Sequence, residues 1–386
     1  MFNYVTVEFP TITKTVPPNR VMGFALVSQR YAHEVVQISF RDWDVEYSAV
    51  KPGTPIRCTL RNPNGSRQFY GYVQYIVPKI SPGSKTTDVV AIGASYVFKQ
   101  ASQRIFQGLT SDQIVKQIAL EQGFAAEVEP HPRVWDQVAQ AGHTDLELMV
   151  RLAKHSGYTL RIQDTTVYFK PFNFDFNTYR PYAPVFTMRE TSSPAGSSLY
   201  AFDSMIGEST NYGDAMKAAV RVAGVDPDSH DAVNAVKNKP GITPDPVIRV
   251  ESSDAVFDRF ATNIVAPGWA PAYYEALAAD ARNKYPYRAM IETMGHPGVR
   301  PDTPVYLDGI GPQYSGYWMV LSIEHQVVEE SLNNLTYVSI MEVGTDSLGT
   351  ASVGTDGSVL PYPYSGASPQ AQGIRRDKEG TVLAYG

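Results

Sequence analysis

The chain has 386 residues, of which 43% are hydrophobic and 19% charged, so it is long enough for two or three domains and too apolar for a disordered protein. Its formal net charge of −6 at pH 7 argues against electrostatic binding of nucleic acid, which needs clustered Lys and Arg. The charge does not exclude the passage of DNA that the protein does not bind. Cys58 is the only cysteine, which excludes an internal disulfide framework and a multi-cysteine zinc site.

The first hundred residues have the pattern of an all-β domain. With 28 Pro, 29 Gly and 24 Tyr, the chain favours many turns and half-buried aromatic surfaces. The expected strands are Val5–Phe9, Gly23–Ser28, Val35–Phe40, Pro55–Leu60, Gln68–Val77 and Val89–Ser95. Asn64 and Gly65 supply the tight turn of a hairpin, and the regular strand spacing predicts a barrel or sandwich. Cys58 shares a face with Ile56 and Leu60 and is expected to be a small core residue.

Two amphipathic helices with the same plan are predicted after Ser102, over Leu109–Gly123 and residues 143–157. Each has a Thr N-cap, a Gln or Glu three residues later, and a closing Gly thirteen residues after the Thr. These positions are Thr110, Gln113 and Gly123 in the first helix, and Thr144, Glu147 and Gly157 in the second. Each helix leads into a β-like segment, which predicts a small α+β unit between larger β domains.

The second half of the chain begins with an aromatic stretch, Tyr168 to Phe186, in which Phe172, Phe174 and Phe176 share one face at strand spacing. This stretch favours a core or a subunit interface, with a sugar-binding platform as the alternative. From Asp203 to Ile248 the pattern loosens into polar loop with a short helix at Asp231–Lys237, which suggests an insertion.

A helix and four strands are expected after this insertion. The helix is Ala272–Lys284, preceded by Pro271 and stopped by Pro286. The strands are Arg288–Thr293, Thr303–Leu307, Tyr317–His325 and Thr336–Glu342.

After Val343 the chain is rich in Gly, Ser and Pro and cannot bury enough apolar surface to order itself. We therefore expect this tail to be held by other chains of an assembly. No stretch approaches the roughly 18 apolar residues of a membrane helix, and the opening MFNYVTVEFP lacks the features of a signal peptide. We expect that the protein does not insert stably into a membrane. We also expect that it is synthesised in a reducing cytoplasm.

No catalytic motif is evident. The sequence has no HExxH, GxSxG, GxxxxGK or strand-linked GxGxxG pattern, and its seven histidines have no metal-ligand spacing. Asp226, Asp228, His230 and Asp231 could ligate a cation, but the run lacks the glycine and distal glutamate of a calcium loop. A solvated loop that caps the following short helix is the simpler interpretation.

Other candidate residues have structural explanations too. Glu147 lies near His143 and Asp145 and could act as a general acid, but its place in the capping box accounts for it. Asp136 and Glu129 are expected in a loop beside Trp135 with no evident partner. His325, at the end of a strand, is expected to be a hydrogen-bonded structural histidine. We therefore assign no catalytic, cofactor-binding or metal-binding residue.

Two sequence blocks resemble the tail hub (baseplate hub) family of tailed phages, which includes phage late control protein D and the VgrG-like spike bases of contractile injection systems. The first block matches at Gln137 or Gln140, Thr144, Asp145, Leu148, Leu152, Ala153, Gly157 and Tyr158. The second matches at Pro301, Val305, Leu307, Gly309, Gly316, Trp318, Val320 and His325. The chain departs from the family where its usual "pG" is Pro301-Asp302, and where residues 203–265 are longer and more polar.

The resemblance implies a β-rich α+β fold with two barrels that resemble tail-tube proteins. The expected division is a first β-barrel domain over 1–101, a small inserted α+β domain over 102–170, a second β-barrel domain over 171–343 with the polar insertion at about 203–265, and an extended tail over 344–386.

The implied function is that of a non-enzymatic, trimeric hub that closes the distal tail tube in the virion, with phage DNA passing through its lumen. The implied partners are the tail tube, distal tail and tape-measure proteins and fibre or spike proteins. The alternative is a tail-associated cell-wall hydrolase or carbohydrate-binding protein, which rests on the aromatic stretch and the scattered carboxylates.

Overall fold

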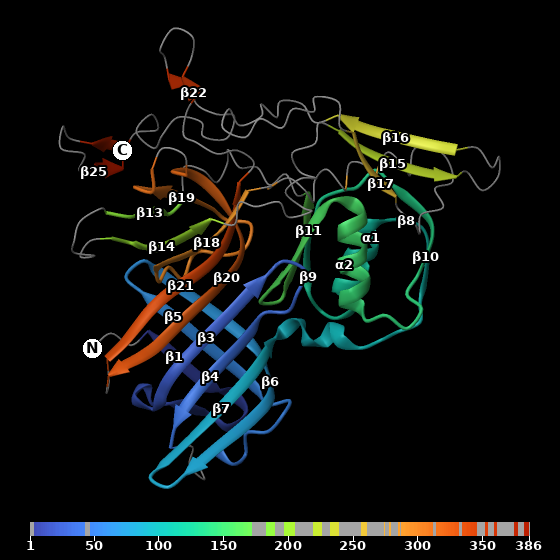
Figure 1. Ribbon diagram of the computed structural model, residues 1–386. Coiled ribbons are helices and arrows are strands. Elements are labelled where there is room, and N and C mark those ends of the chain that lie inside the picture. The colour runs from blue at the N-terminus through green and yellow to red at the C-terminus, as the bar shows by residue number, and fades with distance from the viewer. Residues whose placement is uncertain are drawn as a thin grey trace.

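The computed structural model describes residues 4–42, 47–171, 183–189, 197–204, 285, 287–311, 314–331 and 334–345, together with Tyr274, Ala278 and the short strands between 219 and 260 and between 352 and 385. The fold is β-rich, as predicted, and the described part of the chain has two α-helices with defined bounds, both before residue 160 (Figure 1).

Thirteen strands from both halves of the chain form one sheet. The N-terminal half contributes β1 (Val5–Phe9), β2 (Lys14–Val16), β3 (Val21–Gln29), β4 (Val35–Arg41), β5 (Pro55–Asn62), β6 (Gly65–Ser81) and β7 (Ser84–Gly93), which we call the first lobe. The C-terminal half contributes β13 (Val185–Thr187), β14 (Leu199–Ser204), β18 (Tyr287–Met294), β19 (Pro304–Asp308), β20 (Gly316–Ser331) and β21 (Asn334–Thr345), which we call the second lobe.

The strand order is β14-β18-β21-β20-β3-β4-β7-β6-β5-β1-β2, with β19 pairing to β20 and β13 to β19. The two lobes join where β20 pairs antiparallel with β3, from Ser322 opposite Gln29 to Val328 opposite Gly23. Because β20 is 16 residues long, its first half lies in the second lobe and its second half completes the first.

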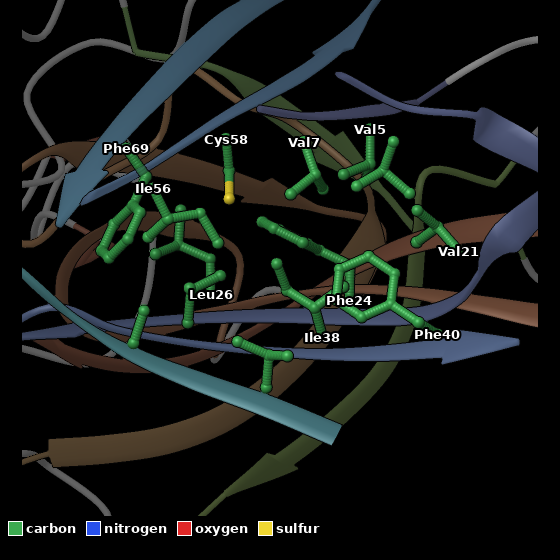
Figure 2. Packing of buried hydrophobic residues seen from close by; sticks show 14 of the residues in the cluster. Val5, Val7, Val21, Phe24, Leu26, Ile38, Phe40, Ile56, Cys58 and Phe69 are labelled. Atoms are coloured by element: carbon green, nitrogen blue, oxygen red, sulfur yellow. The ribbon is translucent and has the colours of Figure 1, made fainter. Parts of the chain in front are cut away.

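Each lobe has its own hydrophobic cluster on the inner face of the shared sheet. The first-lobe cluster includes Phe24, Ile38 and Phe69, and it also takes Val327 from β20 and Tyr337 from β21. Figure 2 shows Cys58 among these side chains, which confirms its predicted core position, and burial raises the pKa of its thiol. The second-lobe cluster is built around Trp318, Ile291 and Val343, among others.

The β5–β6 hairpin is confirmed, with its turn one residue earlier than predicted. Asn62 pairs with Gly65, so Pro63 and Asn64 form the two-residue connection and Gly65 begins β6 at a φ of 141°. A positive φ of this size is a conformation that favours glycine, which explains why Gly65 is placed there.

The small α+β unit contains both predicted helices, α1 (Ser111–Glu121) and α2 (Asp145–Ser156), and both capping boxes are formed. Its strands are β8 (Ile105–Thr110), β9 (Ala125–Val128), β10 (Val134–Ala139), β11 (Tyr158–Gln163) and β12 (Thr166–Pro171). Strands β8 and β10 pair with each other, and β9 pairs with β12. The prediction that Asp136 lies in a loop is wrong, because β8 gives this short, polar segment a pairing partner that no local pattern signals.

The insertion is not the predicted loop with a helix. Its described part contains β15 (Ala219–Val225), β16 (Ala232–Asn238) and β17 (Val256–Phe260), which form a separate three-stranded sheet. The helix expected at Asp231–Lys237 is wrong, since β16 pairs along its full length with β15. Val and Asn, which recur in this segment, are weak helix formers, so pairing overrides a marginal helical pattern.

Several other predictions fall largely outside the described residues, including Phe172, Phe174 and Phe176. Of the helix expected over 272–284, Tyr274 and Ala278 are described, and both are helical. In the C-terminal tail the described pieces are two small hairpins, β22 (Ser352–Val353) with β23 (Val359–Leu360) and β24 (Ile374–Arg376) with β25 (Val382–Tyr385). Neither α1 nor α2 could span a membrane, nor could any other helical piece among the described residues.

A glycine on β6 gives a test of the first-lobe packing. A Cβ at Gly71 would lie 2.2 Å from the Ile92 carbonyl oxygen and 2.7 Å from the Phe69 ring, whereas at Gly23 on β3 its nearest neighbour would be 3.8 Å away. We expect Gly71→Ala to lower the free energy of unfolding by about 1–3 kcal/mol or more, and the control Gly23→Ala to leave it unchanged or raise it by about 0.4–1 kcal/mol. Urea denaturation measures both, and equal stabilities of the two variants would contradict the packing.

Candidate functional site

The seam between the lobes contains a buried cation, Arg67 on β6, whose side chain is 2% exposed. Its Nη1 lies 2.9 Å from Nε2 of His325 on β20, and its Nη2 donates to the Ser28 hydroxyl on β3 at 2.6 Å. Arg67 also forms an ion pair with Glu34, which accepts a second hydrogen bond from Ser28 at 2.8 Å. A buried charge is tolerated only when it is paired and fully hydrogen-bonded, and this network meets both conditions.

His325 joins this network from the other lobe and is fully buried. A guanidinium can only donate, so Nε2 of His325 must accept and the ring proton must be on Nδ1. Nδ1 lies 2.9 Å from the Tyr337 hydroxyl and 3.1 Å from the Ser339 hydroxyl, both on β21. Burial, followed by the charge of Arg67, holds the pKa of His325 well below its usual value. The prediction of a hydrogen-bonded structural histidine is confirmed, with the added role of linking the lobes.

A second buried junction lies at Asp302, where the small α+β unit meets both lobes. Asp302, in the turn before β19, accepts from the Thr159 hydroxyl of β11 at 2.9 Å and forms an ion pair with Arg30, in the turn after β3. Beside it, Arg161 of β11 donates to the Pro301 carbonyl at 2.9 Å. Asp302 has a φ of 67°, a left-handed conformation that favours glycine. A glycine would suit this turn too, but only the aspartate can bind Arg30.

The outer face of the shared sheet runs without interruption across the seam. Pairing places Ile340 beside Glu324, Glu324 beside Val27, and Val27 beside Val35, so side chains of both lobes form one surface. Its strands β18, β21, β20, β3, β4, β7 and β6 are neighbours in that order. Such a continuous face could be presented as a whole to one partner or to one channel.

This outer face has an excess of negative charge in its described part. Its cations Arg41, Lys79 and Arg288 are each within ion-pair distance of a carboxylate, at 2.7, 2.6 and 2.8 Å. Glu324 and Glu292 add negative charge that those three pairs do not neutralise. A surface of this kind repels nucleic acid phosphates, which agrees with the net charge of the chain.

The carboxylates considered as catalytic candidates have structural partners. Glu147 accepts from the Thr144 backbone N–H at 2.8 Å, and this bond is the main reason that its pKa lies below the usual value. Asp145 is buried, accepts from Gln140 at 2.7 Å and forms an ion pair with Arg104. The capping-box interpretation of Glu147 is therefore confirmed.

The remaining candidates do not converge on a site. Asp136 lies on β10, and the Glu129 backbone N–H donates to Phe169. The Asp226–Asp231 run lies outside the described residues. No group of three or more His, Cys, Asp or Glu side chains suited to a metal ion occurs in the described part of the chain. The structure does not bring the predicted polar candidates together.

Arg67 and Arg30 were not singled out from the sequence, and Asp302 was noted only as a departure from the glycine that the resemblance implied. Arg67 did leave a signal, because it is two residues before Phe69 and so shares its inward face. The sequence contains no signal for the role of Arg30, because its partner Asp302 is 272 residues away and the turn that contains Arg30 resembles any polar surface turn.

Comparison with known proteins gives a consistent result. A family model described as phage tail baseplate hub (GPD) matches residues 27–219. No curated protein matches the sequence.

Solved structures with the same fold include the tail protein from Neisseria meningitidis MC58, at 14% identity and a TM-score of 0.61, covering 89% of this chain and 96% of that one. The 43 kDa tail protein of prophage MuSo2 from Shewanella oneidensis has 12% identity and a TM-score of 0.63, covering 89% and 99%. An Escherichia coli component of the type VI secretion system, with 12% identity and a TM-score of 0.52, covers 89% and 74%.

The seam predicts a pH effect on stability. His325 is held neutral in the folded state, while in the unfolded chain it gains a proton near pH 6.5, so acid favours unfolding. Below pH 6.5 this residue should lower the free energy of unfolding by about 1.4 kcal/mol per pH unit. Between pH 7.5 and 5.5 the unfolding free energy of wild type should therefore fall about 1.4 kcal/mol further than that of His325→Gln, while His143→Gln, at an exposed site, is the control. Parallel slopes for wild type and His325→Gln would contradict the assignment.

We expect the ion pair of the Asp302 carboxylate with Arg30 to contribute more to the free energy of unfolding than the left-handed backbone of Asp302 costs. Asp302→Gly relaxes the left-handed turn but leaves Arg30 without its carboxylate, so we expect a loss of about 3 kcal/mol in unfolding free energy. Arg30→Met in the same chain should recover most of that loss. Asp164→Gly, at a φ of 51° in the β11–β12 turn, is the control for backbone relaxation. Urea denaturation distinguishes these outcomes, and an Asp302→Gly variant as stable as wild type would refute the role of the ion pair.

Proposed function

We propose that this chain, which belongs to the phage tail baseplate hub (GPD) family, is the structural hub that closes the distal end of a tail tube as a trimeric ring. Membership of this family makes it a component of the phage tail. Three copies with two lobes each would present six similar lobes around the axis, which suits a junction with a hexameric tube. We infer that each lobe acts as one tube-like barrel.

The proposed domain division follows the sequence: a first barrel over 1–101, the α+β unit over 102–170, a second barrel over 171–343 with an insertion at about 203–265, and a tail over 344–386. Separate hydrophobic clusters in the first lobe, the α+β unit and the second lobe support this division. The tail would lie along neighbouring chains of the assembly.

The observation that carries the proposed channel is the acidic, continuous outer face of the shared sheet. Turned toward the axis of a ring, this face would line a lumen through which phage DNA passes without binding. Because its cations are paired with carboxylates and Glu292 and Glu324 add further negative charge, this face would have no site that binds phosphates.

The proposed partners are the tail tube protein, the distal tail protein, the tape-measure protein and fibre or spike proteins, joined during assembly in the host cytoplasm. Two solved structures of the same fold are PdpA–VgrG complexes, one of them from Francisella, with TM-scores of 0.56 and 0.54. For this chain they support a role as a base to which further tip proteins attach.

The alternative is a cell-wall hydrolase or carbohydrate-binding protein of the tail tip. Its candidate carboxylates Glu147 and Asp145 are engaged in a capping box and an ion pair, which favours the non-enzymatic hub. Zymography on the purified protein separates the two functions: peptidoglycan clearing that an Asp or Glu substitution abolishes would establish the hydrolase.

The ring is tested by the symmetry of assembled particles, in which we expect three-fold symmetry at the hub layer. The channel is tested by Glu292→Lys with Glu324→Lys, which should make the ring bind double-stranded DNA at low salt and release it as salt rises. Wild-type rings, and rings with the exposed control Glu121→Lys on the α+β unit, should not bind. If the double variant forms rings that ignore DNA, the assignment of this face to the lumen is wrong.

A further inference from the structure

A tight turn before β19, residues 300–303, holds one arginine in a fixed position. The Thr303 backbone N–H donates to the Arg300 carbonyl at 3.1 Å, and the Thr303 hydroxyl accepts from the Arg300 backbone N–H at 3.2 Å. Pro301 in second place and Asp302 in third, at a φ of 67°, are the residues that a type II turn favours. The backbone of Arg300 is therefore held from both sides, and its side chain starts from a rigid point.

A second arginine reaches the same turn from the α+β unit. Arg161 of β11 donates from Nη1 to the Pro301 carbonyl, next to Arg300, at 2.9 Å. Both arginines are half-buried. In the described part of the chain neither forms an ion pair, and the Arg300 guanidinium forms no hydrogen bond. The other two arginines of the seam and of the Asp302 junction, in contrast, are each paired with a carboxylate.

Positive charge is in excess around Arg300. Burial is the main cause that lowers the pKa of its guanidinium, and the charges of Arg67 and Arg161 lower this pKa further. Asp164 and Glu34 act in the opposite direction, so three cations face two carboxylates and one positive charge is left over. Like charges gathered in a partly buried place repel each other strongly, so this arrangement favours the binding of an anion.

Two buried polar atoms near the turn lack a hydrogen-bond partner among the described residues. One is Nε of Arg161, which can only donate, and the other is Oδ1 of Asp164, in the β11–β12 turn, which accepts when it is ionised. Buried polar atoms are nearly always hydrogen-bonded, so each exception indicates a place where a further group binds. A group that serves both atoms must accept from Arg161 and donate to Asp164.

Phosphate combines these two properties. Its oxygens accept hydrogen bonds from guanidinium groups, whose planar fork of donors matches the geometry of a phosphate group. At neutral pH inorganic phosphate also retains a proton, which it can donate to a carboxylate. Sulfate has the same shape but no proton at this pH, so a neighbouring carboxylate repels it.

We propose that Arg161 and Arg300 form a binding site for one inorganic phosphate ion, whose protonated oxygen donates to Asp164. Arg161 belongs to the α+β unit and Arg300 to the second lobe, so the bound ion would join these two parts beside the Asp302 junction. The site lies within a single chain. It is therefore independent of the proposed ring and goes beyond the proposed function.

The test is urea denaturation of the full-length chain in phosphate, in sulfate and in chloride at one ionic strength and pH 7. Isothermal titration calorimetry first gives the dissociation constant for phosphate. At about ten times that concentration, phosphate should raise the ratio of folded to unfolded protein about elevenfold over chloride, and sulfate should raise it less. The matched control is Arg57→Gln, at an exposed position on β5, which should respond to phosphate as wild type does.

Arg300→Gln separates a binding role from a structural one. Its removed charge is repelled by its neighbours, so in chloride the variant should be at least as stable as wild type, whereas in phosphate it should be less stable. Arg161→Gln should also lose the response to phosphate, and it serves as the second variant if Arg300→Gln does not fold.

Three results would overturn the site: equal stabilisation of wild type by phosphate and chloride, no measurable phosphate binding, or a phosphate response that persists in both variants. Sulfate as effective as phosphate would overturn the contact with Asp164.

Discussion

The architecture depends on one pairing, that of β20 with β3. Through it, strands that lie at opposite ends of the chain become neighbours in one sheet, and Val327 and Tyr337 complete the hydrophobic cluster of the other lobe. The buried Arg67–His325 contact crosses the same seam. Removing either partner would leave a buried polar group unsatisfied, so the two lobes are held as one body and their outer face stays continuous.

The α+β unit is attached to that body at the Asp302 junction, beside which Tyr31 of the first lobe packs against the hydrophobic cluster of the unit. Arg30 and Thr159 reach Asp302 from the first lobe and from β11, and the Tyr31 backbone N–H donates to Leu160 of the same strand. Charged and backbone hydrogen bonds are directional, so they fix the orientation of the unit with few residues.

Local signals in the sequence were enough for much of the fold. The capping boxes at Thr110 and Thr144 are formed by residues three apart, so both helices could be predicted with their ends. No local pattern encodes the pairing of β3 with β20, because these strands come from opposite ends of the chain. The same holds for the contact between Arg67 and His325, which are 258 residues apart in the sequence. The error at β16 has the same origin, because a strand formed by pairing with β15 carried only a weak pattern of its own.

The abundance of tyrosine also takes on a different meaning. Composition suggested half-buried aromatic surfaces, yet Tyr306 and Tyr317 contact each other edge to face inside the second lobe, and Tyr337 lies in the buried seam. Tyr75 on β6 and Tyr200 on β14 are exposed, as is Tyr96 in the helical turn after β7. A tyrosine that can satisfy its hydroxyl within the chain adds to the core, so burial, and not abundance alone, decides what each tyrosine does.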